Sequence, residues 1–154
     1  MQLIKLKNSD KSAVVDDEDF ERLIKFNWFL SGLGTGIRRN AVLNGKKRST
    51  SMASEIMNMP DKMFDHINRD PFDNRKSNLR AATYKQNGAN KVKRAGCSSI
   101  YKGVSKAKDK WYACIRFNYK TKSLGFYNTE VAAAKAYDDA ARRMQGAFAV
   151  LNFP

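Results

Sequence analysis

The residues that decide the fold lie near the middle of the chain, where residues 65–80 read DHINRDPFDNRKSNLR. Residues 61–91 are dense in Asp, Asn and Arg, contain the single histidine, and have too few apolar residues to form a core by themselves. The spacing is specific, because His66 precedes Asn78 by 12 residues and Asn78 precedes Asn87 by 9. Such a segment is expected to be a functional site that the flanking elements support.

The segment before it, residues 1–60, combines strand-like and helical patterns. An acidic run at residues 16–19 favours a helix from Glu18 to Phe26, because negative charge interacts favourably with the dipole at a helix N-terminus. Residues 27–30 and 37–42 are typical of strands, Asn44-Gly45 of a hairpin turn, and residues 52–57 of a helix. We therefore expect a small N-terminal sheet.

The segment after it, residues 100–154, predicts three strands and a helix. In residues 111–117, strand alternation puts Trp, Ala, Ile and Phe on a core face and Tyr112, Cys114 and Arg116 on the outer face. The helix is expected from Glu130 to about Gln145, where its alanines form a small-residue face able to lie close to a sheet. Local signals limit this helix, with Asn128 or Thr129 as its N-cap and Gly146 as its stop.

Composition narrows the classes of function. The chain has 154 residues, a hydrophobic content of 42% and a net charge of +14, and each third of the sequence is basic. A polyanion is therefore the expected partner. No apolar run approaches the roughly 20 residues of a membrane span, and the charged N-terminus does not resemble a signal peptide. Cys97 and Cys114 lack the paired spacing of a zinc site and are expected to be free thiols.

The intervals around His66 resemble those of the HNH nucleases, whose ββα-metal motif sets a strand, a loop, a strand and a helix around one divalent cation. The resemblance is closest to homing endonucleases of phage type, and it covers residues 65–91 closely and 10–60 loosely. It implies hydrolysis of DNA phosphodiester bonds that leaves a 3′-hydroxyl and a 5′-phosphate. Many relatives carry a His-Arg pair on the preceding helix, where this chain has Ala53 and Ser54 and so lacks that phosphate contact.

The resemblance implies a role for four residues of the motif. Asp65 and Asn87 would hold the metal, and their hard oxygen ligands suit Mg²⁺ or Mn²⁺. His66 would be the general base, since imidazole titrates near neutral pH. Asn78 is expected to fix the tautomer of His66 by accepting the proton of its other ring nitrogen.

Basic residues in and after the motif are expected to contact DNA phosphates. They are Arg69, Arg75, Lys76 and Arg80 in the motif, and Lys91, Lys93 and Arg94 in the connector that follows it. The connector, residues 89–99, is small, polar and basic, as is typical of a flexible segment that follows phosphates. We place the domain boundary near Gly96.

The C-terminal segment resembles an AP2 DNA-binding domain. The ordered pieces that carry the resemblance are SIYKGVS at residues 99–105, KWYA at 110–113, LG at 124–125, AAKAYDDAA at 133–141 and LNFP at 151–154. The resemblance implies a three-stranded sheet laid in the major groove of DNA, with a helix that braces its back.

The AP2 resemblance implies that Lys102 takes the place of a basic groove contact. It also implies that Arg116 stands where members of the family have an arginine. Four other positions depart from plant members, which have arginine, glutamate or tryptophan there: Ser105, Cys114, Thr121 and Ser123. Lys120 and Lys122 are expected to bind phosphates without reading bases. This face is therefore expected to read few bases.

The expected fold class is α+β. A small N-terminal sheet with a ββα-metal motif, residues 1–95, would precede an AP2-like three-stranded antiparallel sheet packed on one helix, residues 96–154. We interpret the chain as a cytoplasmic HNH DNA endonuclease of a phage-infected or bacterial cell, with double-stranded DNA as its partner and neither a membrane nor a protein partner implied. The main alternative is a non-catalytic DNA-binding regulator with a relic nuclease motif. An RNA-binding protein is a weaker one, because the sheet lacks the aromatic pattern used for base stacking.

Overall fold

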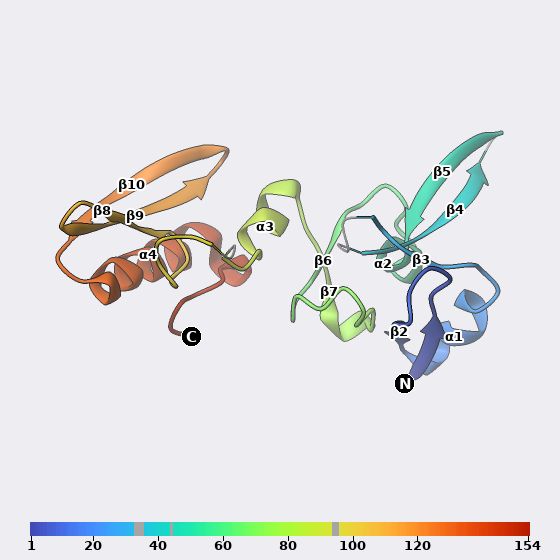
Figure 1. Ribbon diagram of the computed structural model, residues 1–154. Helices are drawn as coiled ribbons and strands as arrows, with labels where there is room; N and C mark the ends of the chain where they lie inside the picture. Colours follow the sequence, from blue (N-terminus) through green and yellow to red (C-terminus); the bar gives the residue numbers. More distant parts are fainter. Residues whose placement is uncertain (33–35, 44, 94–95) are drawn as a thin grey trace. The chain divides into compact units, whose positions relative to one another are not determined.

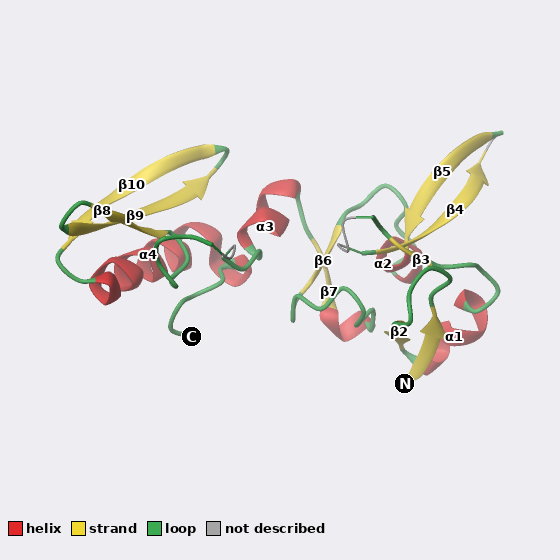
Figure 2. Ribbon diagram, in the orientation of Figure 1, coloured by secondary structure: helices red, strands yellow, loops and turns green. Residues whose placement is uncertain are grey.

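The computed structural model describes residues 1–32, 36–43, 45–93 and 96–154. In these residues it is a mixed α+β protein with several small antiparallel sheets and four α-helices (Figure 2). The chain divides into two compact units, Met1–Thr83 and Tyr84–Pro154 (Figure 1). Helix α3 (Tyr84–Ala89) thus belongs to the second unit, whereas the sequence placed it before a boundary near Gly96. Within this unit, Lys102 Nζ donates a hydrogen bond of 2.6 Å to the carbonyl of Ala89 at the end of α3.

The first unit contains three small antiparallel sheets. Its elements are β1 (Gln2–Lys5), β2 (Ser12–Val15), α1 (Asp17–Leu23), β3 (Phe29–Leu30), β4 (Ile37–Leu43), β5 (Lys46–Ser51), α2 (Met52–Ile56), β6 (Phe64–His66), the 3₁₀ turn η1 (Lys76–Asn78) and β7 (Leu79–Ala81). β1 pairs with β2, β6 pairs with β7, and the third sheet has the order β3-β4-β5. One apolar core, centred on the fully buried Leu23, Trp28 and Met52, holds these short elements together.

Helix α1 ends earlier than the sequence predicted. It stops at Leu23 and not at Phe26, because the indole Nε1 of Trp28 donates a hydrogen bond of 2.8 Å to the carbonyl of Leu23. The chain turns there and buries Trp28 completely. Helix α2 lies close to its predicted span, and its N-cap Ser51 accepts a hydrogen bond from the amide of Ser54. β4 and β5 form a hairpin, as predicted, although Asn44 of the expected turn lies outside the described residues.

The second unit is the three-stranded sheet and helix that the sequence predicted. After α3 come β8 (Val104–Ala107), β9 (Lys110–Phe117), β10 (Lys120–Tyr127), α4 (Glu130–Gln145) and the 3₁₀ turn η2 (Gly146–Phe148), and the antiparallel sheet has the order β10-β9-β8. The predicted limits of α4 are confirmed, because Thr129 Oγ1 accepts from the amide of Ala132 and Gly146 has a positive φ of 53°. Its alanines pack against the sheet, where Ala133 is fully buried.

In the described part of the chain, no helix has both the length and the apolar character that crossing a lipid bilayer requires.

Candidate functional site

The β6–β7 hairpin positions the first two residues of the predicted site. Asp65 lies opposite Arg80 and His66 lies opposite Leu79 in the antiparallel register. Directly opposed residues share a face of the sheet, so the side chains of Asp65 and Arg80 are neighbours. Residues 67–78 form the loop between the two strands. The motif of residues 65–80 is therefore one hairpin with its connecting loop.

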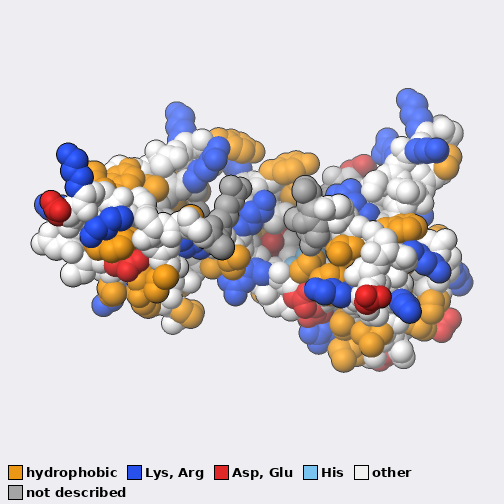
Figure 3. Space-filling view, viewed as in Figure 1, with side chains coloured by type: hydrophobic (Ala, Val, Ile, Leu, Met, Phe, Trp, Pro, Cys, Tyr) orange, Lys and Arg blue, Asp and Glu red, His pale blue; other side chains and the backbone are white. Residues whose placement is uncertain are grey.

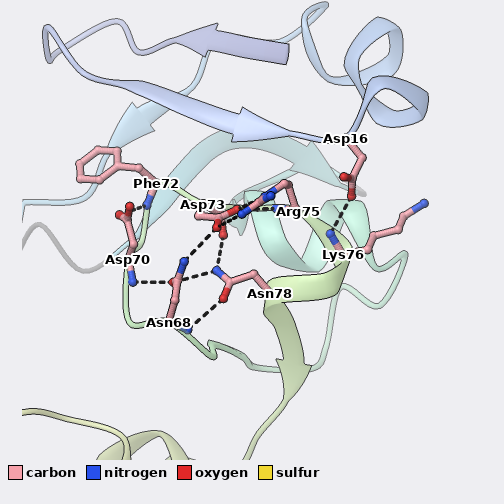
Figure 4. A network of polar contacts seen from close by, with 8 residues as sticks. All are labelled: Asp16, Asn68, Asp70, Phe72, Asp73, Arg75, Lys76 and Asn78. Carbon is pink, nitrogen blue, oxygen red and sulfur yellow. Dashed lines mark hydrogen bonds and ion pairs between the residues drawn. The ribbon is translucent and has the colours of Figure 1, made fainter. Parts of the chain in front are cut away.

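Asn78 ties the two ends of this loop together (Figure 4). Its Oδ1 accepts a hydrogen bond of 2.9 Å from the amide of Asn68, and its Nδ2 donates to Asn68 Oδ1 and to the backbone carbonyl of Asp73, at 2.9 and 2.7 Å. Asn68 Nδ2 in turn donates to Asp73 Oδ2 at 2.9 Å. Asn78 is buried, so these bonds form away from water and fix the loop.

Asp73 and Arg75 form a bidentate ion pair within the loop. Arg75 Nε donates to Asp73 Oδ1 at 2.8 Å, and Arg75 Nη2 donates to Asp73 Oδ2 at 2.7 Å. The hydrogen bonds from Arg75 lower the pKa of the Asp73 carboxyl below its ordinary value, and the same contact raises the pKa of Arg75. Arg75, expected as a phosphate contact, thus has a structural partner, while 41% of its side chain remains exposed.

Lys76 has intramolecular partners, whereas Arg69 is exposed. The amide of Lys76 donates to Asp16 Oδ2 at 2.8 Å, and its ammonium pairs with Glu18 and Asp19 of α1. The hydrogen bond to Glu18 is the main reason that the pKa of Lys76 is raised. Arg69 is exposed, in a left-handed backbone conformation with a φ of 67°. Both residues were expected to contact phosphates, and in the structure Lys76 connects the loop to α1.

The ring of His66 lies against Asn74 and not against Asn78. His66 Nε2 is 3.3 Å from Asn74 Oδ1, whereas the side-chain Oδ1 of Asn78 accepts a hydrogen bond from the backbone amide of Asn68. Asn74 is 1% exposed, and its Nδ2 donates to the carbonyl of Pro71 at 3.0 Å. The structure thus places Asn74 beside His66 and uses Asn78 to close the loop, and the tautomer-fixing role expected of Asn78 stays a prediction.

Asp65 is a buried carboxylate with an arginine beside it. Its exposed fraction is 4%, and its Oδ2 accepts hydrogen bonds from Arg80 Nε and Nη2 at 3.0 and 2.8 Å. A buried carboxylate needs such a partner to remain charged. Arg80, expected as a phosphate contact, therefore neutralises the expected metal ligand.

The second expected metal ligand belongs to the other unit. Asn87 lies on α3, whereas Asp65, His66 and Asn78 lie on one hairpin of the first unit. Over the described ranges, no three His, Cys, Asp or Glu side chains gather into a metal site. The expected pair of one carboxylate and one amide is a different donor set, and it stays a prediction.

The outer face of the C-terminal sheet carries Arg116, as predicted. The register pairs Arg116 with Thr121 and Cys114 with Ser123, while the neighbouring Ile115 is 1% exposed and faces α4. Burial raises the pKa of the Cys114 thiol, so this side chain is neutral at physiological pH. The side chains that surround Arg116 on the outer face are therefore short and uncharged.

An aromatic pair also lies on this face. The register shift between Ser123 and Gly125 places Phe126 opposite Tyr112, with ring centroids 5.0 Å apart, and leaves Phe126 61% exposed. Strict alternation along β10 would have turned Phe126 to the other face.

Lys120 and Lys122 lie on the other face of the strands. They are opposite Phe117 and Ile115, the face that packs on α4, yet both lysines are exposed at the end of the β9–β10 hairpin. Together with Met144 of α4 they line a shallow pocket. Any contact that they make with phosphate would be at the rim of the sheet.

Lys93 of the connector and Lys102, which follows it, have intramolecular partners. Lys93 Nζ donates to the carbonyls of Ser99 and Tyr101, and Lys102 Nζ donates to that of Ala89. Both side chains thus hold the connector in place, although they were expected to contact DNA. Lys91 is exposed, and Arg94 lies outside the described residues.

Sequence reasoning missed Asn68, Asn74 and Phe126. Asn74 is brought to His66 by a long-range contact, in which its amide donates to the carbonyl of Val14 at 2.8 Å. No local pattern reports such a contact. The position of Phe126 on the outer face depends on the bulge at Gly125, whose φ is 113°. A glycine within a strand pattern was the signal that could have indicated this bulge.

Neither a scan against protein-family models nor a search of curated proteins finds a match to this chain.

Proposed function

We propose that this chain is a DNA endonuclease of the HNH type that depends on a divalent metal. One observation carries the proposal. His66 lies beside the buried side chain of Asn74, and Asp65, directly before His66 on the same hairpin, is a buried carboxylate. Such a histidine can act as a general base and such a carboxylate can bind a divalent cation, and metal-assisted hydrolysis uses both groups. The spacing that resembles the HNH motif supports the same proposal.

The hydrogen bonds of Asn74 favour one tautomer of His66. Because Asn74 Nδ2 donates to the carbonyl of Pro71, its Oδ1 is the atom that faces His66 Nε2. An oxygen acceptor there favours the tautomer with the proton on Nε2. The lone pair is then on Nδ1, which is the atom that would take a proton from the attacking water.

The donor atoms fit a hard divalent cation. In the first unit, Asp65 supplies a carboxylate as a ligand for the cation, and Mg²⁺ and Mn²⁺ prefer oxygen ligands. A bound cation of this kind stabilises negative charge on the phosphoryl and leaving oxygens. Asp65 Oδ2 already accepts two hydrogen bonds from Arg80, so a cation would have to share this carboxylate with the guanidinium.

The second unit would target the nuclease to DNA. A three-stranded antiparallel sheet packed on one helix supports the resemblance to AP2 domains. Its outer face offers Arg116 for a guanine edge and the Tyr112–Phe126 pair for apolar contact. We propose that this face binds the major groove of duplex DNA.

Relaxation of supercoiled plasmid tests the proposed activity. Wild-type protein should nick the plasmid in Mg²⁺ or Mn²⁺, and chelator should stop the reaction. His66→Ala should lower the nicking rate by about 10²–10⁴-fold and leave DNA affinity nearly unchanged, because a general base acts only in the chemical step.

Arg69→Ala, at an exposed position of the loop that follows His66, is the matched comparison. It should raise the protein concentration that half-saturates the reaction and leave the rate at saturation unchanged, as expected of a phosphate contact. Nicking by the His66→Ala protein at the wild-type rate would contradict the assignment of the base.

A non-catalytic DNA-binding regulator is the second candidate. It is favoured by one observation, the Asp65–Arg80 ion pair, which satisfies the buried carboxylate without a cation. A protein that binds duplex DNA but nicks no plasmid at any concentration of Mg²⁺ or Mn²⁺ would decide for this candidate.

A further inference from the structure

The β4–β5 hairpin is the most basic element of the first unit. Residues 37–51 contain five basic side chains, Arg38, Arg39, Lys46, Lys47 and Arg48, and no acidic one. The hairpin projects from its unit (Figure 1), and basic side chains gather along its free end (Figure 3).

Packing explains only the root of this hairpin. At the root, Ile37 is buried, and Arg39 pairs with Glu55 at 2.9 Å and lies 4.0 Å above the ring of Phe26. Beyond it, residues 46–49 are all exposed, and Val42 on the opposite strand is 70% exposed. The outer half of the ribbon is therefore in solvent on both strands.

Intramolecular ion pairs leave most of its charge unneutralised. Among the described residues, Arg39 is the one basic side chain of the hairpin that pairs with a carboxylate. Four cations on a ribbon a few residues long repel one another, which costs stability unless an anion binds them.

The dimensions of the ribbon match a groove of duplex DNA. Six residue pairs, from Arg38 with Ser51 to Leu43 with Lys46, make a ladder roughly 20 Å long. The major groove is about 12 Å wide and admits a two-stranded ribbon. Asn40, Ser49 and Thr50 add hydrogen-bonding groups without charge along the same strands.

We propose that the β4–β5 hairpin is a second DNA-binding element, separate from the C-terminal sheet, in which Lys46, Lys47 and Arg48 bind backbone phosphates of duplex DNA. The inference rests on the proposed function, because the nuclease unit must itself bind the duplex that it cuts. No residue of this hairpin belongs to the chemical site, so binding and cleavage can be tested separately.

The test compares two triple variants of the full chain that remove the same charge from the same unit. One is Lys46→Gln, Lys47→Gln, Arg48→Gln in the hairpin. The control is Lys5→Gln, Lys7→Gln, Lys25→Gln, at exposed positions outside it. Affinity for a 30-base-pair mixed-sequence duplex is measured by fluorescence anisotropy in chelator, across a series of salt concentrations.

The hairpin variant should bind about 10–100-fold more weakly at 0.1 M salt, and its log–log salt slope should fall by up to about 2.7, since each phosphate contact contributes about 0.9. The control should keep the wild-type slope. A charge-preserving variant, Lys46→Arg, Lys47→Arg, Arg48→Lys, should bind like the wild type. This variant separates lost charge from lost folding.

Equal losses in the two glutamine variants, or a loss in the charge-preserving variant, would overturn the inference. Competition by single-stranded RNA as effective as that by duplex DNA would overturn duplex DNA as the occupant. Plasmid nicking by the wild type is scored separately. If nicking is absent but the two glutamine variants differ in slope, the nuclease proposal fails and the hairpin assignment stands.

Discussion

Asn74 and Asn78 are two buried asparagines of one loop with different partners. Asn78 bonds to Asn68 and to the backbone of Asp73, so it holds the loop closed. Asn74 faces the ring of His66 and fixes its own amide on Pro71. The first asparagine should therefore act on stability, and the second on the orientation of the proposed base.

Asn74→Ala should lower the nicking rate at saturating protein by about 10–100-fold, the usual cost of losing a group that orients a histidine. DNA affinity should stay at the wild-type value, because Asn74 is 1% exposed and does not reach the surface. Single-turnover nicking and anisotropy measure the two quantities.

Asn78→Ala is the comparison at the residue scale. It should lower the free energy of unfolding by about 1–3 kcal/mol, because it leaves the amide of Asn68 and the carbonyl of Asp73 without their partner. If Asn74→Ala left the nicking rate unchanged and Asn78→Ala reduced it, the original assignment of Asn78 to His66 would be correct.

At the scale of the element, the loop of residues 67–78 contains a pH-dependent ion pair. The pKa of Asp73 is lowered by Arg75, so the pair stabilises the fold fully above the ordinary aspartate value of about 3.9 and is lost as pH falls through the lower folded value. Asp73→Asn should cost about 1.5–3 kcal/mol at pH 7. Urea unfolding at pH 7, 5, 3 and 2 measures the difference, which should shrink only at the two lowest values.

Arg75→Gln gives a second reading of the same ion pair. It should show the same dependence on pH as Asp73→Asn, because either change removes the charge pair. A difference from wild type that persisted undiminished at pH 2 would mean that the ion pair does not cause the stabilisation.

Elements limited by local signals were predictable from the sequence. Helix α4 has the predicted limits because Thr129 and Gly146 act through their own backbone and neighbours. Helix α1 was predicted too long because its end depends on the indole of Trp28, whose hydrogen bond closes a turn that no helix-stop residue marks. The β4–β5 hairpin was predicted from its first strand and the Asn44-Gly45 turn signal, but its exposure on both strands became visible only once the core was known.

Part of the candidate site was also predictable from the sequence, and part of it was not. The resemblance to the HNH motif implied a strand, a loop and a strand around Asp65, His66 and Asn78, and the structure has a hairpin there. The hydrogen-bond partner of His66 could not be predicted, because Asn74 is placed by a backbone contact to Val14 about 60 residues away in sequence. Ion pairing of Arg80 with Asp65 follows from cross-strand register, which spacing alone does not give.

At the scale of the whole molecule, the basic residues fall into two groups. Arg75, Lys76 and Arg80 pair with carboxylates of their own unit. Others are exposed: Lys46, Lys47 and Arg48 on the β4–β5 hairpin, and Arg116, Lys120 and Lys122 on the C-terminal sheet. The DNA contacts that we propose therefore lie on one exposed basic element in each unit.

How much sequence the molecule reads should depend on its outer-face arginine. Bidentate side chains give about 1–3 kcal/mol of discrimination for each base contacted, and Arg116 is surrounded by the short side chains of Cys114, Thr121 and Ser123. We therefore expect a loose consensus under the second unit when the chain selects its site from a random duplex library. Arg116→Ala should relax that consensus, whereas Lys122→Ala, at the rim of the opposite face, should weaken binding to all sequences alike. Sequencing of the selected pools measures both effects, and a long, strict consensus unchanged by Arg116→Ala would mean that another face of the sheet binds DNA.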